Sequence, residues 1–476
     1  MENELKNNRL YKFRPIKSIF DYKELEDEYI YFASQEELND PMEGFINFYW
    51  KGDSVVWENL LKHYIFSFAL CFESYYFTNS EINFDKDFIP IFFDEHKFEK
   101  VPFGSFLKDI ANAFLNDAEI LDFLEFIKVY NRKVFKDELY FYLKTLTSTA
   151  LFYVVDFFHK RYGSFSIKKM PYEGLFKKLT DLYKPLINEH GKRKTTELFD
   201  ILAPFLKQEM DLFNISFKQE YERKMDKNDF EVKTFFFSYF PAFYVDRIRE
   251  IAFPKLYCSC FMSSYENIAN WGYYADSNKG CCLIFEPEIK DGYFCLNLRS
   301  KNLKESLESC KVHKISYSKK IPGIDFFSHL GNLQNNAKEI ESSWYINGQG
   351  EHSKTHKMPE SQAEETEWKQ EYNELLEKLA TSKLPAWKNE NEYRIFLHDG
   401  FECSSDKESR KFCYPFEILK GIAFGINTSE SDKVKIINLM TKKCNDYGRK
   451  DFKFYQANVN KENGKIELAD LMIKVD

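Results

Sequence analysis

The chain has 476 residues, of which 44% are hydrophobic and 30% are charged, and its formal net charge is −8. A chain of this length and apolar content can bury a sizeable core and form two or three domains. The negative balance gives no support to broad binding of nucleic acid or of a membrane surface, although it leaves room for a local basic groove.

The amino terminus, residues 1–8, is polar and has no apolar signal core. The longest apolar stretch, residues 150–158, is short and contains Asp156, whereas a membrane-spanning helix needs about 20 apolar residues. We therefore expect a soluble, cytoplasmic protein. Its ten cysteines follow no regular framework, which predicts reduced thiols and no structural disulfide.

The first part of the chain predicts a small α/β unit. Residues 10–14 alternate between apolar and polar side chains, as a half-buried strand does. Residues 29–33 are a second β-prone run. The sequence Asn39-Asp40-Pro41 then predicts a turn.

From about Phe45 to Arg249 the spacing of apolar residues is mainly helical. Two sets at i, i+3, i+4 and i+7 each predict one buried helix face. These sets are Leu107, Ile110, Ala111 and Phe114, and Phe123, Phe126, Ile127 and Tyr130. A second helical block is expected over residues 172–227.

After about Ile251 the pattern returns to short strands. We expect strands over residues 255–261, 280–286, 392–397 and 418–426. A helix is expected over 269–275, and another over 430–440 with Thr428 or Ser429 as its N-cap. Residues 342–370 are polar and predict a loop or flexible insertion.

These elements predict an α+β fold in which both chain ends form one small mixed sheet. The core domain comprises residues 1–44 and 251–476, and residues 45–250 form a long, mostly helical insertion. Residues 342–370 form the polar loop. Residues 10–43 should share a sheet with residues 255–430.

Three separated segments give the chain a resemblance to a known family. They read LYKFR at 10–14 with YFAS at 31–34 and LNDPME at 38–43, CSCF at 258–261 leading to Trp271, Tyr274, Ala275 and Gly280, and WKNENEYR at 387–394. In this order they resemble the bacterial domain-of-unknown-function family number twenty-nine seventy-one. The closing stretch 419–427 also fits.

The resemblance covers residues 1–45 and most of 251–440. The chain departs from the family pattern at Tyr273 and Asn278, where histidines are expected, and in the length of its helical insertion. The function of this family is poorly defined, so the resemblance implies a fold more than an activity. A role in bacterial antiviral defence, or as a toxin, is an expectation from this resemblance.

Polar residues at three places along the chain also resemble the ordered signatures of ADP-ribosyltransferases. That resemblance implies that Arg14 on an early strand holds NAD, that Ser259 on a middle strand orders the pocket, and that Glu390 and Glu392 form a Glu-x-Glu pair. We assign catalysis to Glu392, Glu390 and Arg14. The residues expected to bind NAD are Arg14, Tyr11, Ser259, Trp271 and Tyr274.

The chemistry explains why these residue types are needed. Breaking the nicotinamide bond creates positive charge on the ribose, which a nearby carboxylate stabilises, and the planar fork of an arginine suits a pyrophosphate. Residues i and i+2 of a strand face the same side, so Glu390 and Glu392 are expected to point into one cleft. We predict that Arg14 lines that cleft too, with Trp271 or Tyr274 on its wall.

Structural roles explain the same residues equally well. Arg14 can form an ion pair with Glu390 or Glu392, and Ser259 can be an ordinary strand residue. Trp271 and Tyr274 at i and i+3 can be core residues rather than stacking platforms.

Asp40 and Glu43 can bind a metal or a ribose, but Asn39 and Asp40 also suit a turn that caps backbone groups. Gly280 is expected to permit a turn or a close backbone approach. The pairs Cys258/Cys260 and Cys281/Cys282 lack the usual zinc spacing, so no metal is predicted. No phosphate-binding glycine loop, nucleophile elbow or dinucleotide fingerprint is found.

Together these features predict a bacterial defence or toxin-like effector with an ADP-ribosyltransferase-like or NAD-cleaving site, using NAD as substrate. One alternative is a non-enzymatic sensor or interaction protein of a defence system, which binds a protein partner through the helical insertion. The other is a metal-dependent nuclease that uses Asp40, Glu43, Glu390 and Glu392. The acceptor of a transferred group is not evident from the sequence.

Overall fold

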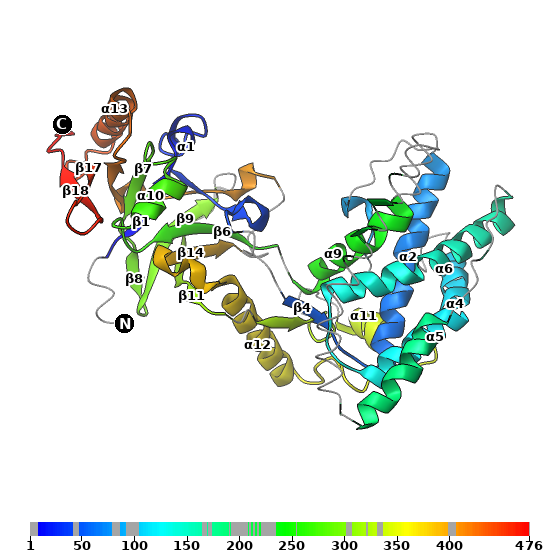
Figure 1. Cartoon of the computed structure of the whole chain (residues 1–476). Helices are drawn as coiled ribbons and strands as arrows, with labels where there is room; N and C mark the ends of the chain where they lie inside the picture. The colour runs from blue at the N-terminus through cyan, green and yellow to red at the C-terminus, as the bar shows by residue number, and fades with distance from the viewer. Residues whose placement is uncertain are drawn as a thin grey trace. The chain divides into compact units, whose positions relative to one another are not determined.

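The computed structural model describes eleven stretches of the chain and a few single positions between residues 169 and 219. These stretches are 8–40, 47–78, 86–91, 104–163, 174–189, 235–253, 255–300, 307–319, 322–330, 337–397 and 406–475. The chain divides into two compact units. Unit 1 comprises residues 1–45, 255–321 and 375–476, and unit 2 comprises 46–254 and 322–374 (Figure 1).

Unit 1 is built on one large, mostly antiparallel sheet, whose path among the described residues runs β18-β17-β16-β7-β1-β6-β14-β10-β9-β15-β2. Two more strands join it, because β3 pairs with β6 and β8 with β9. The strands are β1 (Leu10–Arg14), β2 (Tyr29–Tyr31), β3 (Ala33–Ser34), β6 (Tyr257–Met262), β7 (Cys281–Phe285), β8 (Glu288–Lys290), β9 (Tyr293–Ser300), β10 (Glu308–Lys314), β14 (Glu392–Leu397), β15 (Lys411–Cys413), β16 (Leu419–Phe424), β17 (Lys453–Val459) and β18 (Ile466–Asp470).

Part of this sheet closes on itself. Only Phe32 separates β2 from β3, and β2 pairs with β15 while β3 pairs with β6. The path from β6 through β14, β10, β9 and β15 therefore returns to β6. Its strands contribute to one buried hydrophobic cluster, which includes Phe32, Leu296, Ile395 and Phe412.

Helices and a short second sheet complete unit 1. The helices are α1 (Ile16–Phe20), α10 (Ile268–Tyr274) and α13 (Glu430–Asp446), and the two-stranded parallel sheet is β11 (Ser316–Tyr317) with β13 (Ser382–Lys383). The side chain of Ser429 caps α13 by accepting a hydrogen bond from the backbone of Asp432, as one of the two predicted caps. α13 connects the parallel neighbours β16 and β17.

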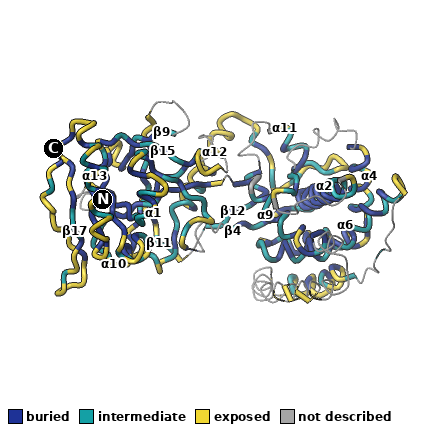
Figure 2. The backbone as a smooth tube through the Cα atoms, turned by 90° about the horizontal axis from the view of Figure 1, so that it is seen from above, coloured by how far each residue is buried: buried dark blue, intermediate teal, exposed yellow. Residues whose placement is uncertain are grey.

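Unit 2 is mainly helical around an aromatic core. Its helices are α2 (Ser54–Thr78), α4 (Gly104–Leu115), α5 (Ala118–Tyr130), α6 (Lys136–Tyr162), α9 (Phe240–Ala252) and α11 (Ala337–Ile340), with π-helical turns at Phe235–Tyr239 and Glu341–Tyr345. A small sheet of β12 (Gly323–Asp325), β4 (Asn47–Trp50) and β5 (Val134–Phe135) lies beside them. Trp50, Trp57, Tyr64 and Trp344 are fully buried, and Figure 2 shows α2 as a largely buried helix.

The strongest periodic patterns are confirmed. The two predicted helix faces are the buried faces of α4 and α5, β1 has the predicted bounds, and β6, β7, β14 and β16 lie within two residues of theirs. The shared sheet is also confirmed, because β1 lies between β7 and β6. The fold is α+β, as predicted.

The segment predicted as a polar loop, residues 342–370, is not a loop throughout. Ser343, Trp344 and Tyr345 are buried in a π-helical turn, and α12 begins within the segment and extends over Gln362–Ala380. Asp53 holds the stretch between them, accepting hydrogen bonds from the backbone of Lys354 and Thr355. Residues 322–374 accordingly pack in unit 2, whereas the sequence placed them in the core domain.

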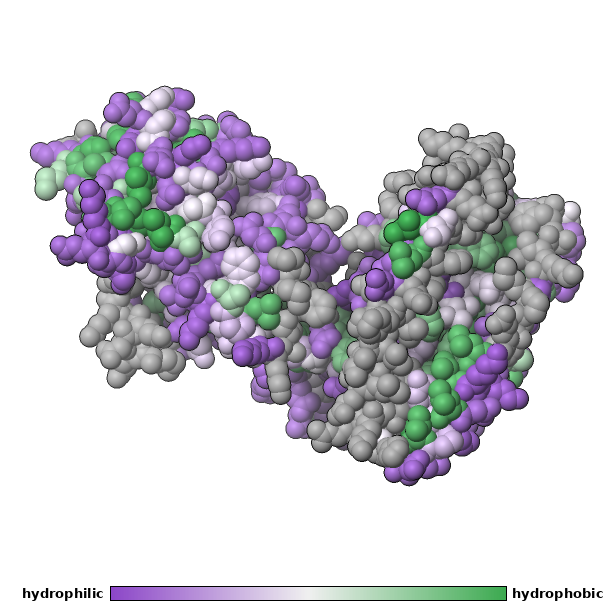
Figure 3. Space-filling view, viewed as in Figure 1, coloured by the Kyte–Doolittle hydropathy of each residue, from purple (hydrophilic) through white to green (hydrophobic). Residues whose placement is uncertain are grey.

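The surface and the thiols are ordinary for a globular protein. In the view of Figure 3 the described surface is mostly hydrophilic, with small hydrophobic areas. Within the described ranges no helix has the length and apolar content that crossing a membrane requires. The nine cysteines that the structure describes are all free thiols.

Candidate functional site

The start of β14 gathers a cluster of buried charged side chains. A short 3₁₀ helix, Pro385–Glu390, is followed by Asn391, whose φ of 48° lies in the left-handed region. Asparagine tolerates this backbone conformation better than most residues. β14 then begins with Glu392. Glu390 and Glu392 therefore do converge, but through this left-handed turn and not as alternate residues of one strand.

Two cations neutralise the two glutamates. Lys383 Nζ, on β13, lies 2.7 Å from Glu390 Oε2 and 2.9 Å from Glu392 Oε2. Arg394 donates to both oxygens of Glu392, with Nε 2.5 Å from Oε1 and Nη2 3.0 Å from Oε2. All four side chains are at most 6% exposed. We call these four residues the β14 charge cluster; its formal charge is zero, as stable burial of ions requires.

The two carboxyl groups of the β14 charge cluster differ in proton affinity. Burial alone would raise the pKa of Glu392, but Arg394 and Lys383 hold it down to about 2. Burial raises the pKa of Glu390 above its ordinary value, and hydrogen bonds from Lys383 and Tyr274 offset only part of that effect. Glu392 is thus a fixed anion, whereas Glu390 is a stronger base than a free glutamate.

Glu390 also forms part of the wall of a pocket of about 310 Å³. We call it the Asn270 pocket. Its lining is polar and comprises Ser264, Glu266, Asn267, Asn270, Asn389, Glu390, Asn391 and Lys465. Tyr274 OH donates to Glu390 Oε1 at 2.6 Å. Burial, and to a smaller extent the negative charge of Glu390, raise the pKa of Tyr274 far above its usual value. Its hydroxyl therefore stays protonated.

Asn270 is the unusual member of this lining. Its side chain is buried, with 1% of the residue exposed, yet neither Nδ2 nor Oδ1 has a hydrogen-bond partner among the described residues. An unpaired buried amide costs about 1–3 kcal/mol, and such groups in native proteins call for a ligand or another explanation. Asn267 is by contrast fully engaged, since it caps α10 and donates to Asn389 O.

Arg14 does not join this site. Tyr11 pairs with Met262, and Met262 pairs with Glu392, so Tyr11 and Glu392 point to the same face of the sheet. Arg14 comes three residues after Tyr11 and therefore points to the opposite face. The prediction that Arg14 and Glu392 line one cleft is wrong, because the strand register separates their side chains by the thickness of the sheet.

Arg14 instead forms an ion pair with Glu24, whose carboxylate accepts from Arg14 Nε at 2.6 Å and from Nη2. On the same face, Lys12 Nζ donates to Ser259 Oγ at 2.7 Å. Burial and the nearby Arg14 lower the pKa of Lys12 to about 8. We call Lys12, Arg14 and Glu24 the β1 charge cluster. Ser259 is 1% exposed and engaged by this cluster, so it does not meet the Asn270 pocket.

Two of the expected aromatic ligand contacts are core residues. Trp271 is 1% exposed, packs edge-on against Phe13 with ring centroids 5.0 Å apart, and donates from Nε1 to Tyr265 O. Tyr11 packs edge-on against Tyr265 at 5.3 Å and is 3% exposed. Of the predicted NAD contacts, Tyr274 alone touches the carboxylates.

The remaining candidates add no metal centre. Asp40 is buried, and Glu43 lies outside the described residues. Across the part of the chain that the structure describes, no three His, Cys, Asp or Glu side chains gather as metal ligands do. Gly280 does allow a close backbone approach, because a Cβ added there would lie 2.2 Å from Arg14 O.

Sequence reasoning missed three residues of the site. Arg394 was visible in principle, because residues i and i+2 of a strand share a face and it follows Glu392 at that spacing. Lys383 gives no local signal, since the pairing of β13 with β11 positions it. Asn270 is an unremarkable helix residue in sequence, and only its buried, unpartnered amide distinguishes it.

Comparisons with known proteins add no relative. No family model, no curated protein and no solved structure matches the chain. The family resemblance described above therefore stays a prediction, and function has to be argued from the site itself.

Proposed function

We propose that unit 1 binds NAD, or a closely related ribosyl compound, in the Asn270 pocket and cleaves its N-glycosidic bond with the help of Glu390. The observation that carries this proposal is the meeting of a buried carboxylate, whose pKa is raised, with a polar pocket rich in amide groups. Sugar hydroxyls need many short-range donors and acceptors, and amide side chains supply both.

The roles follow from the contacts. Water attacks C1′ of the ribose, the C1′–N bond breaks with its electron pair going to the nicotinamide ring, and Glu390 accepts the proton of the attacking water. The charge of the ionised Glu390 carboxylate stabilises the oxocarbenium-like ribose. Tyr274 and Lys383 hold Glu390 in place, and the amide of Asn270 hydrogen-bonds a ribose hydroxyl.

The other expected roles change. Glu392 acts by holding Lys383 and Arg394, because its carboxylate is 1% exposed and bound by both cations. Arg14 no longer serves the pyrophosphate, and Lys465, which lines the pocket and is 61% exposed, takes that role. The bacterial defence or toxin-like setting remains an expectation from the family resemblance.

Release of nicotinamide from labelled NAD tests the proposal. Glu390→Gln keeps the size of the side chain but removes its charge and one of its two hydrogen-bond acceptors, and should lower turnover about a hundredfold or more, as loss of a major electrostatic contributor does. Asn270→Ala should raise KM more than it lowers kcat. Equal nicotinamide release by wild type and Glu390→Gln, or no release by wild type, contradicts the proposal.

The same assay addresses a sensor that binds without turnover. Both oxygens of Glu390 already have partners, Tyr274 on Oε1 and Lys383 on Oε2, which favours a fixed binding group. Equilibrium dialysis that finds NAD bound to wild type and not to Asn270→Ala, without nicotinamide release, identifies this second candidate.

A further inference from the structure

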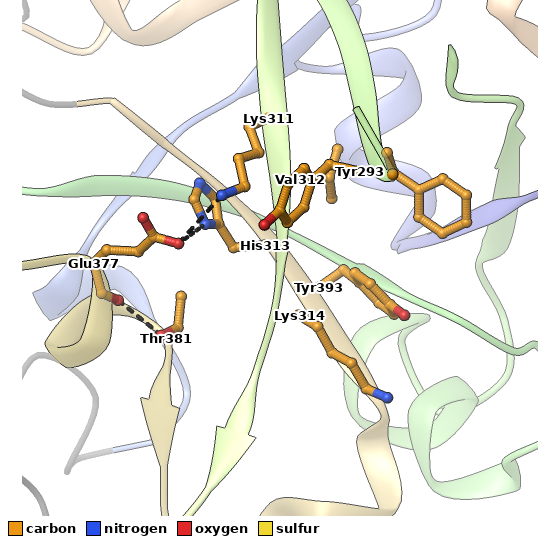
Figure 4. A pocket seen from close by; sticks show the side chains of 10 residues that line it. Tyr293, Lys311, Val312, His313, Lys314, Glu377, Thr381 and Tyr393 are labelled. Carbon is orange, nitrogen blue, oxygen red and sulfur yellow. Dashed lines mark hydrogen bonds and ion pairs between the residues drawn. The ribbon is translucent and has the colours of Figure 1, made fainter. Parts of the chain in front are cut away.

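A second pocket of unit 1, of about 290 Å³, has a different chemistry. We call it the Lys311 pocket. Lys311 and Lys314 of β10 contribute its cations, and His313 of the same strand contributes an imidazole ring. Glu377 near the end of α12 contributes a carboxylate, and Tyr293 and Tyr393 contribute aromatic rings. Figure 4 shows Lys311 and His313 turned toward Glu377, while Lys314 and Tyr393 extend side by side from paired strands.

Positive charge exceeds negative charge in this pocket. Glu377 accepts from His313 Nδ1 at 2.9 Å and lies 3.5 Å from Lys311 Nζ, and it is the one acidic residue among the described residues of the lining. Its side chain is half exposed, so it is free to move aside. An incoming anion with more charge than one carboxylate would replace it as the partner of Lys311 and His313.

The aromatic residues lie beside the cations. Lys311 Nζ lies 3.9 Å from the centre of the Tyr293 ring, and Tyr293 is 50% exposed. The Tyr393 ring packs against Phe294 with centroids 5.9 Å apart. Tyr393 is also the residue of β14 that pairs with Lys314 of β10. A half-exposed tyrosine ring next to a lysine offers a planar ligand a stacking surface close to a site for its anionic group.

We propose that the Lys311 pocket binds a nucleotide. Its phosphate group pairs with Lys311 and His313 in place of Glu377, and its base stacks on Tyr293. Lysines bind phosphate as compact point charges, and stacking on an aromatic side chain tolerates any base. This pocket and the Asn270 pocket share no lining residue, so the nucleotide site stands independently of the proposed cleavage.

Titration calorimetry of the full chain with AMP tests the proposal, with adenosine and inorganic phosphate as separate ligands. AMP should bind, and each of the two fragments should bind at least about tenfold more weakly, since each lacks one half of the contacts. Lys311→Gln should weaken AMP binding about threefold to tenfold. Lys314→Gln should weaken it less, because Lys314 faces the opposite side of β10 from Lys311 and His313. Tyr293→Ala should weaken AMP binding about fivefold or more while leaving phosphate binding unchanged.

The sharpest variant changes affinity in the opposite direction. Glu377→Gln removes the competing carboxylate and should tighten AMP binding about threefold or more. Lys461→Gln is the matched control, because Lys461 is an exposed turn residue that lines neither pocket; its AMP affinity should equal that of wild type.

Three results would overturn the nucleotide site. AMP that fails to bind, or binds equally well to wild type and to Lys311→Gln, removes it. Phosphate that binds as tightly as AMP removes the base contact. AMP binding that is lost in Glu390→Gln but kept in Lys311→Gln places the nucleotide in the Asn270 pocket instead. The expected result is that Glu390→Gln binds AMP as wild type does, even when it no longer cleaves NAD.

Discussion

The two buried charge clusters of unit 1 lie on opposite faces of the sheet, on strands that both pair with β6, and they are built differently. In the β1 charge cluster Arg14 and Glu24 form a one-to-one ion pair, and Lys12 donates to Ser259 instead. None of these three residues lines the Asn270 pocket or the Lys311 pocket. In the β14 charge cluster Lys383 is shared by two carboxylates, and one of these carboxylates, Glu390, lines the Asn270 pocket.

The difference shows that a buried ion pair is not by itself a functional site. A one-to-one pair satisfies its own charges, so its contribution is structural. When one cation serves two anions, one anion is held less tightly. In the β14 charge cluster this anion is Glu390, which also lines the Asn270 pocket. The proposal for the Asn270 pocket therefore rests on the uneven sharing of Lys383 and on the unpartnered amide of Asn270, rather than on the presence of charge.

The largest expected effect comes from breaking the β14 charge cluster. Arg394→Met leaves Glu392 with Lys383 alone and should lower the free energy of unfolding by about 3–5 kcal/mol, the usual cost of an uncompensated buried charge. Urea unfolding measures it. The double variant Glu392→Gln with Arg394→Met should recover a substantial part of the loss, and a single-variant cost below about 1 kcal/mol would show that water reaches this cluster.

Acid should act on the same cluster through Glu392. Its folded pKa of about 2 lies below the ordinary value of 4.5, so its stabilisation is present above about pH 4.5 and is lost as the pH falls toward 2. The full effect is about 3 kcal/mol. Unfolding midpoints measured between pH 2.5 and 6 should fall more steeply for wild type than for Glu392→Gln, and parallel curves would contradict the assignment.

The β1 charge cluster should be less sensitive. Glu24→Gln removes the anion, but the Arg14 side chain is 22% exposed and regains some hydration, so the expected loss is about 1–3 kcal/mol in urea unfolding. NAD cleavage should be unchanged in this variant, apart from the effect of any unfolded fraction. A larger loss for Glu24→Gln than for Arg394→Met would reverse the ranking of the two clusters.

The smallest effect on stability is expected at Glu390. Because burial raises its folded pKa, its ionisation opposes folding as the pH rises through that value, which is the reverse of Glu392. Glu390→Gln leaves Lys383 paired with Glu392 and removes a carboxylate whose buried ionisation is unfavourable. It should therefore change the free energy of unfolding at neutral pH by less than about 1 kcal/mol while lowering turnover about a hundredfold or more. A thermal melt alongside the nicotinamide assay separates the effect on stability from the effect on turnover. A loss of several kcal/mol in the free energy of unfolding would make Glu390 a structural residue.

Periodic elements could be predicted from the sequence, and the joint geometry of the site could not. The strand patterns at 10–14 and 392–397 and the helix faces of α4 and α5 are local consequences of side-chain alternation and spacing. Which face Arg14 occupies depends on its register against Met262 and Glu392, from distant parts of the chain. β9, β10, β17 and β18 were missed because their exposed faces and polar residues give weak alternation.

The resemblance to ADP-ribosyltransferases named four polar residues, of which the structure brings Glu390 and Glu392 together around Lys383. It directed attention to Glu390 and Glu392, which do meet Tyr274 and a polar pocket. It also assigned roles to Arg14 and Ser259, which the structure engages elsewhere. The positions that now carry the proposal, Asn270 and Lys383, depend on tertiary pairing that no single-sequence pattern encodes.

The closed path of strands has a consequence for synthesis of the protein. Ala33 of β3 pairs with Cys258 of β6, so two residues that lie 225 positions apart in the chain must meet. At about 5–20 residues per second, a ribosome needs roughly 10–45 seconds to deliver the second after the first. Throughout that interval the segment around Phe32 has no sheet to join. Unit 2 is complete once residue 374 has been made, whereas the ring of strands in unit 1 can close only after β15 has followed.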